Sequence, residues 1–254
     1  MKLTILGSGS FISDLGHWGP GYLLEIGKKK ILIDAGSGVQ IQLLKLGIKL
    51  EDLDYIFITH FHTDHTTDLT SIHMRYRNLA KKFKPNYSKK LQIIGPSNIE
   101  KFIQNLYRIS GLGNKYDPKT AICKNAFTKI KFSDFRFETF KTKHMENVES
   151  CIYRFENVGK SVVFSGDTIK CSGIETACKN ADLLIADCSI SKNQTNVVHW
   201  NTYEIGEVCQ KQKVKKVILS HLMPKGLKYD LVSEVKEKFD GEVILAEDLM
   251  QIKL

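Results

Sequence analysis

Three histidines and one aspartate fall within the six residues from His60 to His65, directly after the apolar run at residues 55–58. Residues two apart in an extended segment point to the same face, so His60 and His62 can bind one metal ion together. Asp64 and His65 lie just past the extended stretch, where the chain turns, and can serve a neighbouring ion. Imidazole nitrogen and carboxylate oxygen are ligands that zinc accepts. A fold that uses this motif must bring further ligands to the end of this strand.

Three later residues of ligand type lie at or shortly after the ends of other apolar runs. His144 follows the strand-like stretch at 135–140, Asp167 follows 162–164, and His221 follows 217–218. Strand ends on one rim of a sheet can gather ligands from distant parts of a sequence. His144 or His221 alone would be an ordinary loop histidine, but together with the first motif they predict a two-metal site. Asp34 is expected to orient a ligating imidazole rather than to be a ligand itself.

These motifs resemble those of the metallo-β-lactamase fold hydrolases. The resemblance runs through nearly the whole chain, from residues 6–10 through 31–36 to the strand expected at 244–248. It implies an α/β fold, the αββα four-layer sandwich, formed by a single domain over residues 1–254. It also implies a first metal held by His60, His62 and His144, a second held by Asp64, His65 and His221, and Asp167 as the bridge between them.

Within that family, the chain looks most similar to ribonuclease Z and the related small phosphodiesterases. Those proteins carry a carboxylate after a strand and then a His-Ser-Thr-like turn, and Asp187 and His199 stand at the corresponding positions here. The resemblance implies that His199 is a proton donor and that Asp187 orients it, although the family usually has Glu at the latter position. Ribonuclease Z also carries a long tRNA-clamping arm between its third histidine and its bridging aspartate. Only 22 residues separate His144 from Asp167, which leaves no room for that arm.

The reaction that this resemblance implies is hydrolysis of a phosphodiester, at an RNA 3′ end or in a small or cyclic diester, by a hydroxide bound to two divalent metal ions. Zinc is expected, and manganese or iron(II) can occupy the same ligands. Asp64 would accept the proton of the hydroxide, and His199 would protonate the leaving alkoxide. Two alternatives remain: a carboxylic ester or thioester hydrolase of the glyoxalase II type, and a non-catalytic binding protein on the same scaffold.

Composition restricts the setting in which this chemistry takes place. The chain shows no secretory leader and no apolar run long enough for a membrane span, and its six cysteines are expected to be free thiols, so a cytoplasmic protein without a membrane partner is predicted. A net charge of +9 favours a polyanionic partner. Basic and aromatic residues alternate from Arg75 to Lys90, a pattern that suits contact with RNA and equally suits a solvated helix face. A homodimer is expected.

Apolar runs alternate with helical patterns along the chain, which indicates an α/β architecture with more than one sheet. Ser97 followed by Glu100 forms a capping-box pattern before one of the helices. Strands are predicted near residues 2–6, 22–26, 30–34, 55–58, 91–94, 130–140, 150–155 and 161–165, and helices near 39–46, 69–80, 99–110 and 203–212.

Overall fold

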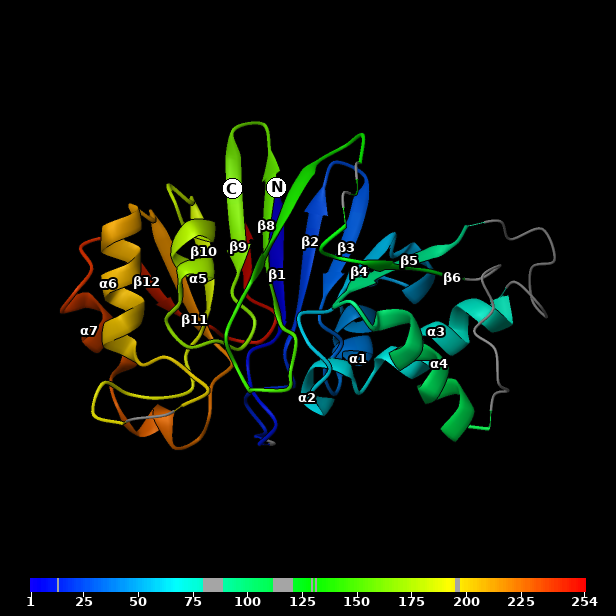
Figure 1. Cartoon of the computed structure of the whole chain (residues 1–254), viewed down its shortest axis with the longest axis horizontal. Helices are drawn as coiled ribbons and strands as arrows, with labels where there is room; N and C mark the ends of the chain where they lie inside the picture. Colours follow the sequence, from blue (N-terminus) through cyan, green and yellow to red (C-terminus); the bar gives the residue numbers. More distant parts are fainter. Residues whose placement is uncertain (13, 80–88, 112–120, 129, 131, 195–196) are drawn as a thin grey trace.

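Two mixed β-sheets lie face to face, and helices cover the outer face of each (Figure 1). The structure is a computed structural model that describes residues 1–12, 14–79, 89–111, 121–128, 130, 132–194 and 197–254. Its architecture confirms the predicted αββα sandwich.

The first sheet is built mainly from the N-terminal half of the chain. Among the described residues it has seven strands in the order β13-β1-β2-β3-β4-β5-β6, with β3 to β6 parallel to one another. These strands are β1 (Lys2–Gly7), β2 (Gly21–Ile26), β3 (Lys29–Ile33), β4 (Tyr55–Phe57), β5 (Leu91–Gly95), β6 (Ala121–Asn125) and β13 (Gln251–Lys253). The helices on this side are α1 (Val39–Lys45), the 3-10 helix η1 (Leu50–Asp52), α2 (Thr63–Thr66), α3 (Leu69–Asn78) and α4 (Ile99–Ile109).

The second sheet is built from the C-terminal half. Its described part has six strands in the order β12-β11-β10-β9-β8-β7, of which β9 to β12 run parallel. These strands are β7 (Arg136–Lys141), β8 (Cys151–Asn157), β9 (Lys160–Phe164), β10 (Leu183–Asp187), β11 (Lys216–Ser220) and β12 (Glu242–Leu245). The helices on this side are α5 (Ser172–Ala177), α6 (Thr202–Gln212), the 3-10 helix η3 (Gly226–Lys228) and α7 (Leu231–Lys236).

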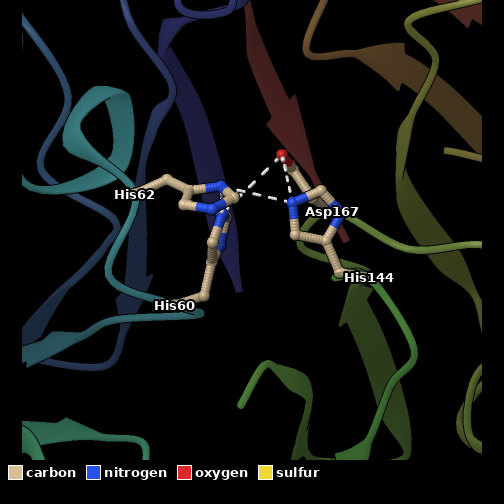
Figure 2. Close-up of side chains that lie close together, drawn as sticks. All are labelled: His60, His62, His144 and Asp167. Atoms are coloured by element: carbon tan, nitrogen blue, oxygen red, sulfur yellow. Dashed lines mark hydrogen bonds and ion pairs between the residues drawn. The ribbon is translucent and has the colours of Figure 1, made fainter. Parts of the chain in front are cut away.

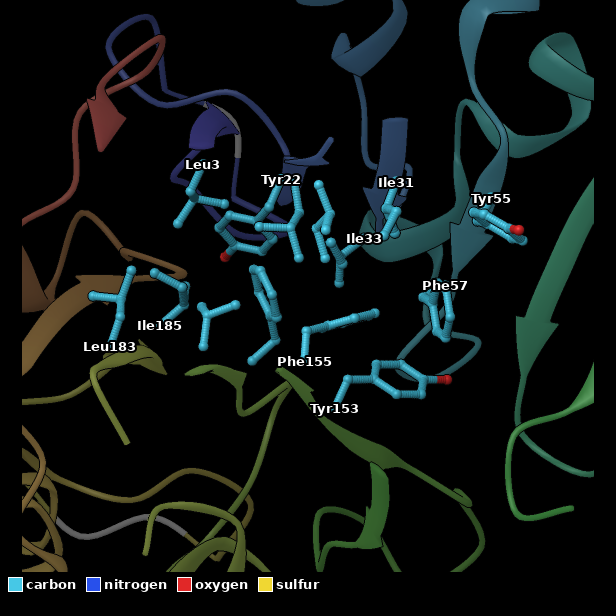
Figure 3. Packing of buried hydrophobic residues seen from close by; sticks show 14 of the residues in the cluster. Leu3, Tyr22, Ile31, Ile33, Tyr55, Phe57, Tyr153, Phe155, Leu183 and Ile185 are labelled. Atoms are coloured by element: carbon cyan, nitrogen blue, oxygen red, sulfur yellow. The ribbon is translucent and has the colours of Figure 1, made fainter. Parts of the chain in front are cut away.

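The core consists of three apolar layers, one between the sheets and one under each set of helices. Ile31 and Ile33 of β3 face the other sheet (Figure 3). Leu32 belongs instead to the layer beneath the helices. Phe57 of β4 meets Tyr153 and Phe155 of β8 edge to face, with ring centroids 5.1 and 5.0 Å apart. Because both faces of the sheets are covered, the central strands read as continuous apolar runs rather than as alternating patterns.

Several strands of each sheet end at one rim of the sandwich because they run in the same direction, and the loops that follow these strands lie at that rim. Strands β1, β3 and β4 run in one direction within the first sheet, and β7, β9, β10 and β11 do so within the second. Their carboxyl ends therefore share an edge in each sheet, and the side-chain contacts of the metal centre show that the two edges coincide. The short helix α2 lies at this rim, at the bottom of Figure 1.

Several local predictions were wrong, and the structure supplies the reasons. The strand expected near 130–140 begins only at Arg136, because Phe132 and Phe135 before it pack on the core; the ring of Phe132 lies 4.6 Å from that of Tyr55. The capping box at α4 is absent: the N-cap is Asn98, and Ser97 bonds to Glu149 instead.

Two further differences concern strands. The strand expected at 244–248 ends earlier, at Leu245, and strands β6 and β13 were not predicted.

The basic segment from Arg75 to Lys90 is only partly described, since residues 80–88 lie outside the described residues. At its two ends, Arg75 pairs with Glu51 at 3.5 Å and Lys89 pairs with Asp54 at 3.4 Å. RNA contact by this segment stays a prediction. Within the described ranges, no helix is long and apolar enough to cross a membrane. All six cysteines are free thiols.

Candidate metal centre

The structure brings together the seven residues predicted as metal ligands, at the shared rim of the two sheets. Their ligand atoms form groups in which all atoms lie within 4.8 Å of one another. One group contains His60, His62, His144 and Asp167, and the second contains Asp64, His65 and His221. Both sheets contribute to the cluster, because the first motif follows β4 while the other ligands follow β7, β9 and β11.

The first group converges on one point (Figure 2). His62 Nδ1 lies 2.9 Å from His60 Nε2 and 3.2 Å from His144 Nε2. Asp167 Oδ2 is 3.7 Å from His60 Nε2 and 3.8 Å from His144 Nε2. An ion with tetrahedral ligands at zinc–nitrogen distance would hold those ligands about 3.3 Å apart. The four atoms therefore fit one such ion.

The second group has the same spacing. His221 Nε2 lies 3.3 Å from both His65 Nε2 and Asp64 Oδ2. Asp167 offers its other oxygen here, with Oδ1 3.2 Å from His65 Nε2 and 3.4 Å from His221 Nε2. That oxygen is buried and has no aligned hydrogen-bond donor among the described residues. A buried carboxylate oxygen without a donor is costly, so a cation shared between the two groups fits this position.

Asp34 fixes the orientation of the imidazole of His65. Its Oδ2 accepts a hydrogen bond from His65 Nδ1 at 2.8 Å and one from the Thr59 hydroxyl at 2.9 Å. Its Oδ1 accepts from the backbone N–H of Thr59 at 2.8 Å. With Nδ1 protonated, the Nε2 of a neutral His65 carries the lone pair that faces the centre. These hydrogen bonds agree with the orienting role expected for Asp34, which stays a prediction.

Two other candidate ligands are oriented in the same way. His144 Nδ1 donates to the carbonyl oxygen of Val198 at 2.8 Å, and His221 Nδ1 donates to the hydroxyl of Ser189 at 2.8 Å. Each bond uses the ring proton on the side away from the centre and leaves Nε2 as the inward-facing ligand atom. The hydroxyl of Ser189 in turn donates to Asp187 Oδ1 at 2.7 Å. Sequence reasoning gave Ser189 no role.

The backbone at the rim adopts conformations that most residues avoid. His221 has φ 56°, in the left-handed region where non-glycine residues are uncommon. Gly166, just before Asp167, has φ 55°, and a Cβ there would lie 2.9 Å from the Cβ of Thr59. A glycine at this position therefore lets the loop after β9 approach the loop after β4 closely enough for Asp167 to reach both ligand groups.

Opposite charges dominate the electrostatics of the cluster. Burial lowers the pKa of His221, but Asp167 and the other carboxylates nearby outweigh it and raise the pKa to about 10. Burial raises the pKa of Asp167, but the imidazoles of His221 and His65 outweigh it and hold that pKa well below its usual range. His60 is surrounded by other imidazoles, and burial together with the charge of His65 lowers its pKa well below the ordinary value. The carboxylates are therefore favoured as anions, which attract positive charge. His60 is favoured as a neutral imidazole, whose nitrogen lone pair can bind a metal ion. Both properties suit divalent cations.

Asp187 and His199 form a hydrogen-bonded pair beside the ligands. His199 Nδ1 donates to Asp187 Oδ2 at 2.7 Å. The His199 ring lies 5.2 Å from the ring of His144 and 5.6 Å from that of His221. Burial lowers the pKa of His199, but the adjacent Asp187 outweighs it and raises the pKa. Its proton-donor role stays a prediction, although the geometry places its free ring edge beside the ligand cluster.

Glu234 of α7 was missed by sequence reasoning and holds the segment that carries His199. Its buried carboxylate accepts hydrogen bonds from the hydroxyl of Ser191 at 2.8 Å, the backbone N–H of Lys192 at 3.0 Å and the hydroxyl of Thr202 at 2.6 Å. Ser191 and Lys192 precede His199 in the sequence and Thr202 follows it. The Glu234 carboxylate therefore joins the two ends of the segment that carries His199. All three partners are at least 32 residues away in sequence, and no local pattern could have indicated them.

We expect metal-reloaded protein to contain two equivalents of divalent metal per chain, most of it zinc when several metals are offered. The reason is that the seven residues supply two complete groups of ligand atoms joined by one carboxylate. The number of metal equivalents per chain is measured by elemental analysis, after the chelator has been removed and the protein has been saturated with metal. A limit of one equivalent at saturation would contradict the two-ion arrangement.

Known proteins resemble the chain over its full length. Residues 1–240 match the sequence profile of the family described as Anti-Pycsar protein Apyc1. The probable metallo-hydrolase YhfI of Bacillus subtilis is 28% identical over 250 residues, which is 97% of each chain. Its crystal structure, described as that of a metallo-β-lactamase fold protein, superposes with a TM-score of 0.86 over 99% of this chain and 98% of that one.

Two other known proteins are similar to the chain over its length. The ribonuclease Z of Mycolicibacterium gilvum is 24% identical and covers 100% of this chain and 96% of its own length. The crystal structure of a diphosphatase from the PhnP family shares the fold, with a TM-score of 0.74, 19% identity and coverage of 100% and 97%. Together with the His and Asp cluster, the similarity to YhfI and to ribonuclease Z supports a metallo-hydrolase.

Proposed function

The chain belongs to the Anti-Pycsar protein Apyc1 family and is a metal-dependent hydrolase of the metallo-β-lactamase fold, and from that premise we propose that it hydrolyses small phosphodiesters, linear or cyclic. We also propose zinc as its metal and a homodimer as its working form. Six free thiols suit a reducing compartment, and we propose the cytoplasm as its location.

The observation that carries this proposal is the pair of Asp187 and His199 beside the ligand cluster. A phosphodiester releases an alkoxide, a poor leaving group that needs a proton, whereas a thioester releases a thiolate that does not. A cavity of about 410 Å³ lies over the cluster, and His199 lines it together with His62, His144 and Asp167. A diester in this cavity would meet the ligands and the proton donor at the same time, which favours phosphorus over the thioester alternative.

The side chains divide the work of the reaction. When bound, two divalent ions lower the pKa of a water molecule and offset the charge of the phosphoryl oxygens. Asp64 has a second carboxylate oxygen besides the one in the ligand group, and in our proposal it takes the proton of the attacking water. His199 gives its proton to the departing oxygen, and Asp187 stabilises the imidazolium and holds the ring in the tautomer that presents Nε2.

The chain segment between His144 and Asp167 supports a small substrate. The described residues from 145 to 166 form a loop followed by the hairpin of β8 and β9, and that hairpin turns at Val158 and Gly159. No residue of this segment extends as an arm that could clamp a tRNA. The net charge of +9 still favours a phosphate-bearing substrate.

We therefore expect the metal-loaded protein to hydrolyse bis-p-nitrophenyl phosphate and cyclic nucleotides, to process precursor tRNA poorly, and to leave S-lactoylglutathione intact. The absence of a clamping arm removes much of the binding surface for a large RNA but none of the groups that act on phosphorus. Initial rates with equal enzyme concentrations measure the preference, and light scattering on the same samples gives the oligomeric state. Efficient cleavage of precursor tRNA would refute the small-substrate proposal, and turnover of the thioester alone would refute the phosphodiesterase proposal.

A further inference from the structure

His199 stands on a loop and not on a strand or helix. The loop runs from the end of β10 to the start of α6, and a β-bridge between Ile190 and Asn201 joins its two sides. A misplacement of a reacting group by about 1 Å can cost about a hundredfold in rate. A proton donor on a loop therefore needs further contacts that hold the loop in one position.

Trp200 holds the side of the loop that follows His199. Its indole N–H donates to the carbonyl oxygen of Asp187 at 2.6 Å, and its backbone N–H donates to the carbonyl oxygen of Thr168 at 2.9 Å. The ring is fully buried in the apolar layer beneath the helices of the second sheet. Because Asp187 is also the partner of the His199 ring, Trp200 fixes the chain after His199 relative to the carboxylate that orients it.

Glu234 of α7 holds the side of the loop that precedes His199. Its Oε1 accepts a hydrogen bond from the hydroxyl of Ser191 at 2.8 Å, and its Oε2 accepts one from the backbone N–H of Lys192 at 3.0 Å. The same Oε2 accepts from the hydroxyl of Thr202, the first residue of α6. The beginning of the loop is thereby fixed relative to the helix at its end.

Packing alone does not require a carboxylate at this position. Glu234 is only 7% exposed, and its neighbours Leu231 and Val235 on α7 belong to the apolar layer. Burial of a charged group opposes folding, whereas an apolar side chain of similar volume carries no such penalty. A carboxylate accepts hydrogen bonds in defined directions, which an apolar side chain cannot do. Its presence here therefore determines the position of the loop more than it contributes to the core.

We propose that Glu234 is a positioning residue for proton transfer by His199; this inference rests on the proposed function. Glu234 acts through the loop and not through contact with the substrate. With the loop held, His199 keeps Nδ1 on Asp187 and its ring 5.2 Å from that of His144. Without the Glu234 carboxylate the loop shifts, and His199 then delivers its proton to the departing oxygen less often.

Glu234→Met tests this proposal, because it removes the acceptors and keeps a side chain of similar length. We expect it to slow hydrolysis of an alkyl diester by about tenfold to a hundredfold and that of bis-p-nitrophenyl phosphate much less, with two equivalents of metal retained. In a His199→Ala background it should cause no further loss on the alkyl diester. Glu234→Gln should restore most of the rate, since its amide oxygen can accept from Lys192 and Thr202 while its amide nitrogen donates to the Ser191 hydroxyl.

Asp248 provides the matched control. It lies between β12 and β13 and closes a different loop, because it accepts from the backbone N–H of Ser8 at 2.8 Å and from that of Trp18 at 2.9 Å. This loop does not carry His199, so Asp248→Leu should change the rates on both diesters by the same factor. If Glu234→Met also lowers both rates by the same factor, or loses metal, the positioning role is wrong.

A smaller change guards against a variant that does not fold. Thr202→Val removes one donor to Glu234 and leaves the carboxylate and the other two bonds in place. We expect the same preference for the good leaving group, with a smaller loss on the alkyl diester. Equal rates of Thr202→Val and the unsubstituted protein on the alkyl diester, with Glu234→Met unfolded, would show that Glu234 serves stability alone.

Proton NMR of the zinc-loaded protein separates this inference from the proposed function. The Nδ1 proton of His199 lies in a 2.7 Å hydrogen bond to Asp187 and should give a far-downfield signal, identified by its loss in His199→Ala. We expect Glu234→Gln to keep this signal and Glu234→Met to lose it by exchange with water. Its loss in Glu234→Met, in a protein that hydrolyses no phosphodiester, would support the positioning role and refute the phosphodiesterase. An unchanged signal and an unchanged alkyl diester rate in Glu234→Met would overturn the positioning role and leave the phosphodiesterase standing.

Discussion

Asp167→Asn is expected to reduce the metal content from two equivalents to one or fewer and to lower kcat by more than about a hundredfold. Each oxygen of this carboxylate faces a different group of imidazoles, so its loss opens both ligand sets at once. Substitution of residues that merely orient ligands already costs about ten- to a hundredfold, and loss of a shared ligand should cost more. Elemental analysis and initial rates on bis-p-nitrophenyl phosphate measure the two effects.

Thermal unfolding gives a reading of Asp167→Asn that does not depend on activity. Metal at about a hundred times its dissociation constant adds about 2.7 kcal/mol to the stability of the unsubstituted protein, or about 5–10 °C in Tm for a chain of this size. We expect the variant to lose most of this gain. Asp240→Asn changes an exposed carboxylate on the surface and is the matched control. Two equivalents and a full metal-dependent rise in Tm in Asp167→Asn would show that it is not the bridge.

His199→Ala is expected to leave the metal content intact and to slow hydrolysis of an alkyl diester by about 10²–10⁴-fold. The effect should be much smaller with p-nitrophenolate as the leaving group, because that anion hardly needs a proton. Asp187→Asn should show a weaker form of the same defect, since it removes the partner of His199 Nδ1 but not the imidazole. Kinetics on paired substrates with good and poor leaving groups measure the difference.

Metal analysis of His199→Ala also tests a competing arrangement. His199 lies close enough to Asp167 and His221 to complete a third group of ligand-type atoms within 4.8 Å of one another. If His199→Ala strips a metal ion, His199 is a ligand and the assignment of His221 or His144 must change. An unchanged rate on the alkyl diester, with full metal content, would show that His199 does not donate the proton.

The seven candidate ligands lie together in the structure, and local signals in the sequence explain why; that they bind metal stays a prediction. The motif after β4 places two histidines on one face, and each later ligand stands at or shortly after the end of an apolar run, where strand direction alone brings it to the rim. Glu234 and Asp248 could not be found in the same way. Each accepts hydrogen bonds that join the ends of a loop far away in sequence. No local sequence pattern around a carboxylate indicates which backbone N–H groups will donate to it.

The errors in the fold have the same origin. Ser97 and Glu100 have the local pattern of a capping box, but Glu149, 52 residues from Ser97, takes its hydrogen bonds. Strand β13 pairs with β1 in a register that joins Lys2 to Lys253, and nothing in its three residues indicates an edge strand. Contacts with residues distant in sequence determined the cap of α4 and the pairing of β13, whereas residue propensity and periodicity determined the central strands.

The division of the ligands between the two sheets bears on how the protein becomes competent. Residues 60–65 emerge first during synthesis and offer only part of each coordination shell, and the remaining ligands arrive some eighty to one hundred and sixty residues later. Neither half can capture an ion firmly until the sheets have docked. Metal binding by the seven candidate ligands would therefore require the two sheets to be docked, because a chain with undocked sheets lacks the complete ligand groups.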